Sequence, residues 1–206
     1  RMRLQPAGIA GDRLLKLACA ALSALILAAA GPAAAAQSGT APERPALIVT
    51  IVIDQLGANL FNQYRGRLSG GLARLAGEGV VYPNGYQSHA MTETCPGHST
   101  ILTGAHPAAT GIPANDWIDR TTGEELYCLA APANALAHGR NSDNGPVGPD
   151  HLLVSALPDW LKAASPDSRV FAVSGKDRGA ITLNSRTGDG AYWYTNDFGF
   201  TTYVEP

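Results

Sequence analysis

The sequence predicts an α/β fold in which helices cover both faces of a largely parallel central sheet. An unbroken apolar run over residues 47–53 is typical of a strand buried on both faces, as strands of parallel sheets are. Apolar residues spaced by three and four over 68–76 indicate an amphipathic helix. Further strands are indicated over 80–82, 170–173 and 191–194. Strands and helical patterns therefore alternate, which is typical of layered α/β domains.

Two more helices and one long loop complete the expected order of elements. A short helix is expected to start at Thr94, whose side chain would cap it, and to end at Gly104. Helical spacing returns over 152–163, whereas residues 131–149 are rich in Asn, Gly, Pro and Ala and are expected to form a surface loop. Because no internal repeat is visible, residues 47–206 are interpreted as part of one domain.

Residues 1–36 are typical of a secretory signal peptide. Basic residues precede an uncharged apolar run over 17–30, and the alanines at 34–36 fit cleavage just before Gln37. The competing interpretation is an uncleaved membrane anchor, but the run is shorter than the roughly 20 residues that span a bilayer. No stable membrane anchor is therefore expected. Residues 37–46 are predicted to be a flexible lead-in, and the mature protein is expected to be periplasmic or secreted.

The charge of the chain argues against two classes of partner. The 206 residues carry 17 acidic and 15 basic side chains, for a formal net charge of −2, and the two signs are interspersed. No basic field is present that would attract nucleic acid or an anionic membrane. Any recognition of phosphate is therefore expected to be local.

The cysteines leave three possibilities open. Cys19 is expected to leave with the signal peptide, so an oxidising compartment makes a disulfide between Cys95 and Cys128 possible. Two unpaired buried thiols, or pairing with residues outside this chain, fit the sequence as well.

Asp54 and Thr94 are the first candidates for chemistry. Asp54 ends the apolar run over 47–53, and ligands of open α/β sheets gather beyond the carboxyl ends of strands. Thr94 stands at a helix start, where backbone N–H groups favour a phosphate, but its hydroxyl needs a metal to become a good nucleophile near neutral pH. Ordinary helix caps are the competing interpretation for both residues.

Lys176 and Arg178 follow the strand expected over 170–173. With one residue between them, both side chains would point to the same side of an extended backbone. A guanidinium and an ammonium together suit the oxygens of a dianionic phosphate monoester. The alternative is a solvated turn in which Asp177 is the local counter-ion.

Several separated motifs together resemble the monomeric threonine-nucleophile alkaline phosphatases of the bacterial alkaline phosphatase superfamily. They occur in the order and at the spacing of that family, and the resemblance covers nearly all of residues 45–193. The motifs are HAMTETCPGHSTILTG over 89–104, IVIDQ over 51–55, Gly111-Ile112, Asn115-Asp116-Trp117 and SGKDR over 174–178.

The resemblance implies a role for each matching residue. Asp54 is implied as a zinc ligand, Thr94 as a zinc ligand and as the nucleophile that becomes phosphorylated, and Asn115 as a donor to a phosphate oxygen. Lys176 and Arg178 are implied as the phosphate clamp of monoesterases, so the expected substrates are small phosphate monoesters. Two zinc ions are expected in the complete enzyme, calcium is possible, and the family suggests a monomer.

The chain departs from the family because the other zinc ligands of those enzymes come from a later part of a longer chain. Only Asp54 and Thr94 of the expected metal ligands lie within these 206 residues, whereas a zinc site normally needs three or four. The fold is therefore expected to be incomplete, and the chain alone is expected to bind two zinc ions poorly and to be inactive. Two other functions stay open: a phosphodiesterase or nucleotide pyrophosphatase of the same superfamily, and an inactive exported phosphate-binding module.

The histidines do not supply the missing ligands. His98 lies one helical turn beyond Thr94 and is interpreted as part of the helix framework. The remaining histidines lack metal-ligand spacing to one another and are assigned no role: His89, His106, His138 and His151.

Overall fold

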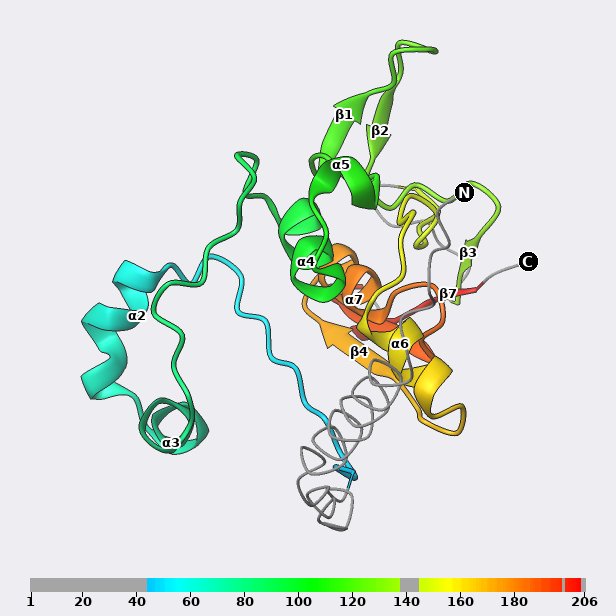
Figure 1. Cartoon of the computed structure of the whole chain (residues 1–206). Coiled ribbons are helices and arrows are strands. Elements are labelled where there is room, and N and C mark those ends of the chain that lie inside the picture. Colours follow the sequence, from blue (N-terminus) through cyan, green and yellow to red (C-terminus); the bar gives the residue numbers. More distant parts are fainter. Residues whose placement is uncertain (1–43, 138–144, 198, 205–206) are drawn as a thin grey trace, which may run out of the picture. The chain divides into compact units, whose positions relative to one another are not determined.

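The computed structural model describes residues 44–137, 145–197 and 199–204 (Figure 1). The proposed signal peptide, most of the lead-in and His138 lie outside these ranges. The chain divides into two compact units between Thr50 and Ile51, and only residues 44–50 of the first are described. Within the described ranges, every helix is too short or too polar to span a lipid bilayer.

The hydrophobic core lies within residues 94–204, and no residue of the fully described segment 44–93 is buried. Large apolar side chains pack together in this core, among them Ile112, Leu129, Ile181 and Trp193. Four helices lie within residues 94–204: α4 (Thr94–Thr103), α5 (Pro107–Thr110), α6 (Leu157–Ala164) and α7 (Asp177–Asn184). Seven strands accompany them: β1 (Asp116–Ile118), β2 (Glu125–Tyr127), β3 (Ala135–Leu136), β4 (Phe171–Ser174), β5 (Gly190–Thr195), β6 (Gly199–Thr201) and β7 (Tyr203–Val204).

The strands of the described residues form three small sheets, and one of them holds a parallel pair. In that sheet β4 pairs in parallel with β5, which pairs antiparallel with β6. Helix α7 is the crossover between β4 and β5 and packs against both strands and against α4 (Figure 1). Side chains of β5 alternate as the period of two requires, with Ala191 and Trp193 buried and Tyr192 and Tyr194 exposed. The strands predicted over 170–173 and 191–194 are confirmed.

Helix α4 has the predicted extent, but Thr94 does not cap it. Gly104 ends the helix with a φ of 66°, a left-handed conformation that suits glycine. The N-cap residue is Glu93, and Thr94 is the first helical residue. The predicted cap is wrong because Thr94 lies inside the helix, and its hydroxyl donates to Asp54 instead of accepting from a backbone N–H of the first turn.

Segment 44–93 contains helices but not the expected strands. Helix α2 (Ala58–Tyr64), the 3-10 helix η1 (Arg65–Arg67) and α3 (Gly70–Glu78) follow one another, and α3 confirms the helix predicted over 68–76. Residues 47–53 and 80–82 form no strand, and Leu47 is 76% exposed. The strand predictions are wrong here because a strand needs a neighbour for its backbone hydrogen bonds, and no described segment pairs with either run.

Two expectations in the second half of the chain need correction. Residues 131–149 do not form a purely surface loop, because Ala131 and Val147 are fully buried and Ala130 forms a backbone bridge with Val147. Helix α6 begins at Leu157 rather than at residue 152, with Pro158 in its first turn, a position where the missing N–H of proline costs no helical hydrogen bond.

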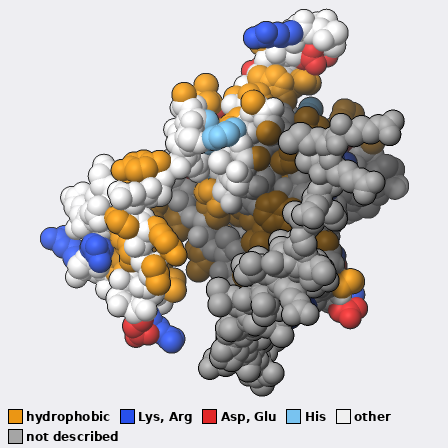
Figure 2. All heavy atoms as spheres, viewed as in Figure 1, with side chains coloured by type: hydrophobic (Ala, Val, Ile, Leu, Met, Phe, Trp, Pro, Cys, Tyr) orange, Lys and Arg blue, Asp and Glu red, His pale blue; other side chains and the backbone are white. Residues whose placement is uncertain are grey.

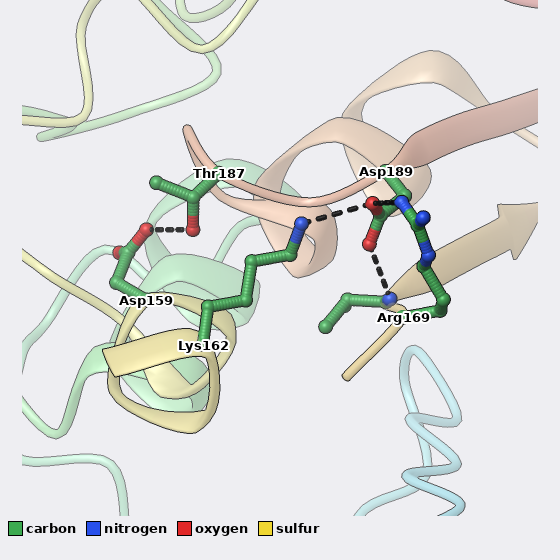
Figure 3. Close-up of polar contacts among 6 residues, drawn as sticks. Asp159, Lys162, Arg169, Thr187 and Asp189 are labelled. Atoms are coloured by element: carbon green, nitrogen blue, oxygen red, sulfur yellow. Dashed lines mark hydrogen bonds and ion pairs between the residues drawn. The ribbon is translucent and has the colours of Figure 1, made fainter. Parts of the chain in front are cut away.

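A polar network joins α6 to the parallel sheet (Figure 3). The Asp189 carboxylate accepts hydrogen bonds from Arg169 at 2.8 Å and from the backbone N–H of Val170 at 2.7 Å, and Lys162 pairs with it at 2.9 Å. Asp159 at the start of α6 accepts from the hydroxyl of Thr187 and from the backbone N–H of Ala156. The two carboxylates thus hold the loop before β5 against α6.

Candidate active site

Thr94 and Asp54 lie side by side although 40 residues separate them in the chain. The Thr94 hydroxyl donates to Asp54 Oδ2 at 3.2 Å. Thr94 is half-buried at the start of α4, whereas Asp54 is exposed in a turn. The next residue, Gln55, has a φ of 60°, a left-handed conformation that costs a side chain roughly 1–2 kcal/mol. Two oxygen atoms suited to a metal ion are therefore adjacent here.

A pocket of about 450 Å³ is lined in part by Asp54. Its walls come from residues 52–57 and from the region of α4, and they include the side chains of Asp54, Glu93 and His98. His98 is buried, and its Nδ1 lies 2.8 Å from the carbonyl oxygen of Thr94 one turn earlier. The volume lies within the range of small-molecule pockets, which is about 300–1,000 Å³.

Asn115 is held by three hydrogen bonds, two to the start of α4 and one to Cys128. Its Oδ1 accepts from the backbone N–H of Cys95 at 2.9 Å, and its own backbone N–H donates to the Glu93 carboxylate at 2.7 Å. Its carbonyl oxygen accepts from the backbone N–H of Cys128 at 2.8 Å. Because Oδ1 is used as an acceptor, the amide nitrogen Nδ2 remains a donor for an anion.

A disulfide joins Cys95 and Cys128, whose Cα atoms are 6.4 Å apart. Both residues are fully buried in the core. The bond connects the first turn of α4, immediately after Thr94, to the end of the β1–β2 hairpin, immediately after Tyr127. The start of α4 and the base of the hairpin are therefore tied covalently.

Lys176 and Arg178 are arranged differently from the expected extended pair. Lys176 is the exposed N-cap residue of α7, and the helix has already begun at Asp177, so the two cations do not alternate along a strand. Arg178 is half-buried and donates through Nη1 to the hydroxyl of Tyr127 at 3.3 Å. Within the described ranges, no carboxylate lies at ion-pair distance from the Lys176 ammonium group.

Asp177 does not serve as a solvated counter-ion, because it is 7% exposed and its Oδ1 atom accepts two hydrogen bonds. Its Oδ1 accepts from the Tyr127 hydroxyl at 2.9 Å and from the backbone N–H of Arg178 at 2.7 Å. Burial and the negative charge of Asp177 raise the pKa of Tyr127, so this phenol keeps its proton. No role was predicted for Tyr127 or Glu93, and Asp177 was considered only as a solvated counter-ion, because the local sequence does not indicate contacts with distant residues.

The candidate residues thus form two connected groups. Thr94 contacts Asp54, and Asn115 contacts the residue next to Thr94. Arg178 lies on α7, which packs against α4. Among the residues that the structure describes, no group of three or more His, Cys, Asp or Glu side chains gathers as a metal site. The Asp54 and Thr94 oxygens therefore fit as part of a metal shell and do not complete one.

Comparison with known proteins places these features in a family context. The model of the family "Type I phosphodiesterase / nucleotide pyrophosphatase" matches residues 48–205. Alkaline phosphatase PhoK of a Sphingomonas species is 48% identical over 162 residues, which cover 77% of this chain and 28% of that protein. Alkaline phosphatase PhoD of Zymomonas mobilis is 43% identical over 162 residues, which cover 77% of this chain and 27% of that protein.

A solved structure agrees with these matches. The crystal structure of wild-type alkaline phosphatase PafA superimposes with a TM-score of 0.72 at 31% identity, covering 79% of this chain and 32% of the PafA chain. PafA of Elizabethkingia meningoseptica is also a sequence relative, at 31% identity over 166 residues. The predicted α/β class and the resemblance to alkaline phosphatases are confirmed. The chain spans only about a third of the length of these relatives or less.

Proposed function

Because the chain belongs to the type I phosphodiesterase / nucleotide pyrophosphatase family, we propose that its complete protein hydrolyses phosphate monoesters, with Thr94 as the nucleophile. The observation that carries this proposal is the 3.2 Å hydrogen bond between the Thr94 hydroxyl and Asp54 at the start of α4. Several relatives of the matched region are alkaline phosphatases by name, which supports the same reaction class.

The proposed reaction proceeds in two displacements at phosphorus. In the first, the Thr94 oxygen forms a bond to phosphorus, the bond to the ester oxygen breaks, and the alcohol leaves with a proton. In the second, water attacks the phosphothreonine, which releases inorganic phosphate and restores the Thr94 hydroxyl. Before substrate binds, Asp54 orients the Thr94 hydroxyl by accepting a hydrogen bond from it.

Zinc is the cofactor that the family suggests, with two ions in the complete enzyme. When bound, zinc supplies the Lewis acidity that lowers the pKa of a hydroxyl group, and Asp54 and Thr94 are the residues of this chain that would hold it. The remaining ligands have to come from elsewhere in the complete protein, because a zinc site needs three or four of them.

The charges around the site favour a phosphate that carries its full negative charge. The amide nitrogen Nδ2 of Asn115 is a donor for phosphate oxygens, whereas Oδ1 already accepts from the backbone N–H of Cys95 at the start of α4. Arg178 is able to bind two oxygens with its planar fork, and Lys176 adds a point charge that no described carboxylate neutralises. A monoester dianion offers more oxygen charge to these groups than a diester does.

The proposal includes export from the cytoplasm. Residues 1–36 have the zoning of a signal peptide, and a disulfide between Cys95 and Cys128 suits an oxidising compartment. The complete enzyme would therefore act on small phosphate esters in the periplasm or outside the cell, as a monomer.

The test is a comparison of matched substrates with the complete gene product in the presence of zinc. We expect an aryl phosphate monoester to be hydrolysed faster than the corresponding diester. We also expect Thr94→Ala to lower kcat/KM for the monoester by more than about 1,000-fold, whereas Thr121→Ala at the exposed hairpin tip changes it less than about twofold.

Two results would favour other functions. Faster turnover of the diester would assign the protein to the phosphodiesterases that the family name includes. Phosphate binding without turnover of either ester would indicate an inactive binding module, the function suggested by the absence of a three-ligand metal cluster in the described residues.

A further inference from the structure

Tyr127 is a buried residue that contacts both a charged acceptor and a charged donor of α7. Its side chain is 8% exposed at the end of β2. Its hydroxyl lies 2.9 Å from Asp177 Oδ1 and 3.3 Å from Arg178 Nη1, although about fifty residues separate these partners from it in the chain. The phenol oxygen thus bridges two consecutive residues at the start of one helix.

The chemistry of the three groups allows one direction for each hydrogen bond. The Asp177 carboxylate is only an acceptor, so the phenol has to donate its single proton to it. The lone pairs of the phenol oxygen are then left to accept from Arg178, which carries only donors. Because burial raises the pKa of Tyr127, the proton stays in place across the working pH range of enzymes.

The Arg178 side chain is oriented by its contact with Tyr127, and this contact uses only part of its N–H donors. Its guanidinium carbon lies 6.0 Å from the centre of the Tyr127 ring, within the range of a cation–π contact. Its Nε atom is buried and has no hydrogen-bond partner among the described residues. The Nη1 hydrogen bond and the ring contact, both to Tyr127, therefore orient a guanidinium group that has further N–H donors.

Strand pairing and a disulfide connect the region of Tyr127 to the residues beside Thr94. In the β1–β2 hairpin Tyr127 pairs with Asp116, the neighbour of Asn115. The next residue, Cys128, is bonded to Cys95 beside Thr94. Tyr127 thus connects the hairpin that carries Asn115 with the helix that carries Arg178, which is the geometry needed to hold two phosphate-binding groups in register.

We infer that Tyr127 is a positioning residue for phosphate recognition, holding the Arg178 guanidinium toward the phosphate oxygens of a monoester through its bridge to Asp177. The inference rests on the proposed function and adds to it the residue that orients the clamp. Tyr127 touches neither the reacting phosphorus nor Thr94. Its effect is expressed through Arg178 alone.

The experiment removes only the bridging oxygen. Tyr127→Phe in the complete gene product keeps the ring in the core and deletes the hydroxyl. We expect the inhibition constant for inorganic phosphate to rise by about tenfold, the range for one hydrogen bond to a charged group, and kcat/KM for an aryl monoester to fall by a similar factor. Turnover of the matching diester, which presents less charge to Arg178, should change by less than about twofold.

A double-mutant cycle separates positioning from packing. In an Arg178→Ala background the further change Tyr127→Phe should have little effect on phosphate inhibition, because the group that it orients is gone. Tyr194→Phe is the matched control: Tyr194 is exposed on β5, its ring contacts Phe200, and this variant should behave as wild type.

The possible outcomes distinguish failure of the inference about Tyr127 from failure of the proposed function on which it rests. Wild-type protein that binds zinc and hydrolyses neither ester overturns both. If the wild-type protein is active and Tyr127→Phe leaves the inhibition constant for phosphate unchanged, only the inference about Tyr127 is overturned. The inference is also overturned if Tyr127→Phe weakens phosphate inhibition equally in the wild-type and the Arg178→Ala backgrounds, because the Tyr127 hydroxyl would then act through packing. If Tyr127→Phe does not fold, Asp177→Asn weakens the same bridge, and it should raise the phosphate inhibition constant by about threefold.

Discussion

Segments 44–93 and 94–204 differ sharply in how they are stabilised. The first contains α2 and α3, yet none of its residues is buried, and hydrophobic side chains are visible on the surface of this part (Figure 2). Leu60, Tyr64, Leu72 and Leu75 are among its exposed apolar residues. The second contains all of the described core, the disulfide and the parallel strand pair. Secondary structure is thus present in both segments, whereas tertiary packing is confined to one.

The difference shows that the candidate active site has a rigid part and a weakly supported part. Thr94, Asn115 and Arg178 are anchored by α4, the β1–β2 hairpin and α7, which share one core. Asp54 lies in the segment without buried residues, and its hydrogen bond from Thr94 is its side-chain contact to the packed segment. The side proposed to bind phosphate is therefore anchored in the packed segment, and the side proposed to bind metal depends on further contacts.

The largest effect expected from this contrast is the loss of unfolding free energy when a core residue is replaced. Trp193→Ala removes a side chain that is 2% exposed in β5 and should lower the free energy of unfolding of this chain by about 3–5 kcal/mol. Leu75→Ala removes a side chain that is 58% exposed in α3 and should change it by less than about 0.5 kcal/mol. Urea unfolding of both variants is the measurement, and comparable losses would contradict the contrast.

A slightly smaller effect is expected from the disulfide. Replacing Cys95 and Cys128 together by serine removes a cross-link that spans 33 residues and should cost about 3 kcal/mol of unfolding free energy. Amide hydrogen exchange should become faster in α4 and β2 and stay unchanged in α2, because only the packed segment contains the link. Equal acceleration in both segments would show that they unfold as one unit.

The network at Asp189 predicts a dependence of stability on pH. Hydrogen bonds from the backbone N–H of Val170, then from Lys162 and Arg169, lower the pKa of Asp189. A carboxyl group whose pKa is lowered by folding stabilises the protein above its unfolded value of about 4, and this contribution is lost as pH falls through the folded value. The melting temperature of Asp189→Asn should therefore fall less steeply below about pH 4 than that of the wild type.

Asp167, which is exposed on the loop before β4, provides the matched control for this prediction. Asp167→Asn should leave the acid limb of the melting profile as in the wild type. An unchanged profile in Asp189→Asn would show that the network does not contribute to acid stability.

The smallest effect is expected in α3, whose described contacts are local. Arg74 and Glu78 form an i,i+4 ion pair at 2.9 Å with both side chains exposed. Arg74→Ala should lower the stability of this chain by no more than about 0.5 kcal/mol, and 0.5 M salt should remove most of the difference. Helix content by circular dichroism is the measurement. A loss above about 1 kcal/mol would mean that α3 is supported by tertiary contacts.

Elements with strong local patterns were predicted well, and elements that depend on partners were not. Helix α4, with Pro96 in its first turn and Gly104 after its last, was expected at its observed position. The hairpin β1–β2 was missed because three-residue strands are too short to show alternation. Helix α7 was missed because the cations at 176 and 178 fit an extended segment equally well.

The candidate site shows the same division. The motifs indicated Asp54, Thr94, Asn115, Lys176 and Arg178 as candidates, because each lies in a stretch that resembles the alkaline phosphatases. The supporting residues were not identifiable, because Glu93, Tyr127 and Asp177 acquire their roles from contacts across 22 to 51 residues. No local periodicity encodes such contacts.

The amino-acid sequence alone was sufficient to predict the family, the α/β class and the residues that match the motifs of the family. Folding in three dimensions was needed to aim the Thr94 hydroxyl at Asp54 instead of at its own helix, and to bring Tyr127 between Asp177 and Arg178. The reason is the range of the forces involved. Backbone preferences and capping act over a few neighbouring residues, whereas hydrogen bonds between residues that are distant in the sequence form only when the tertiary structure brings both partners together.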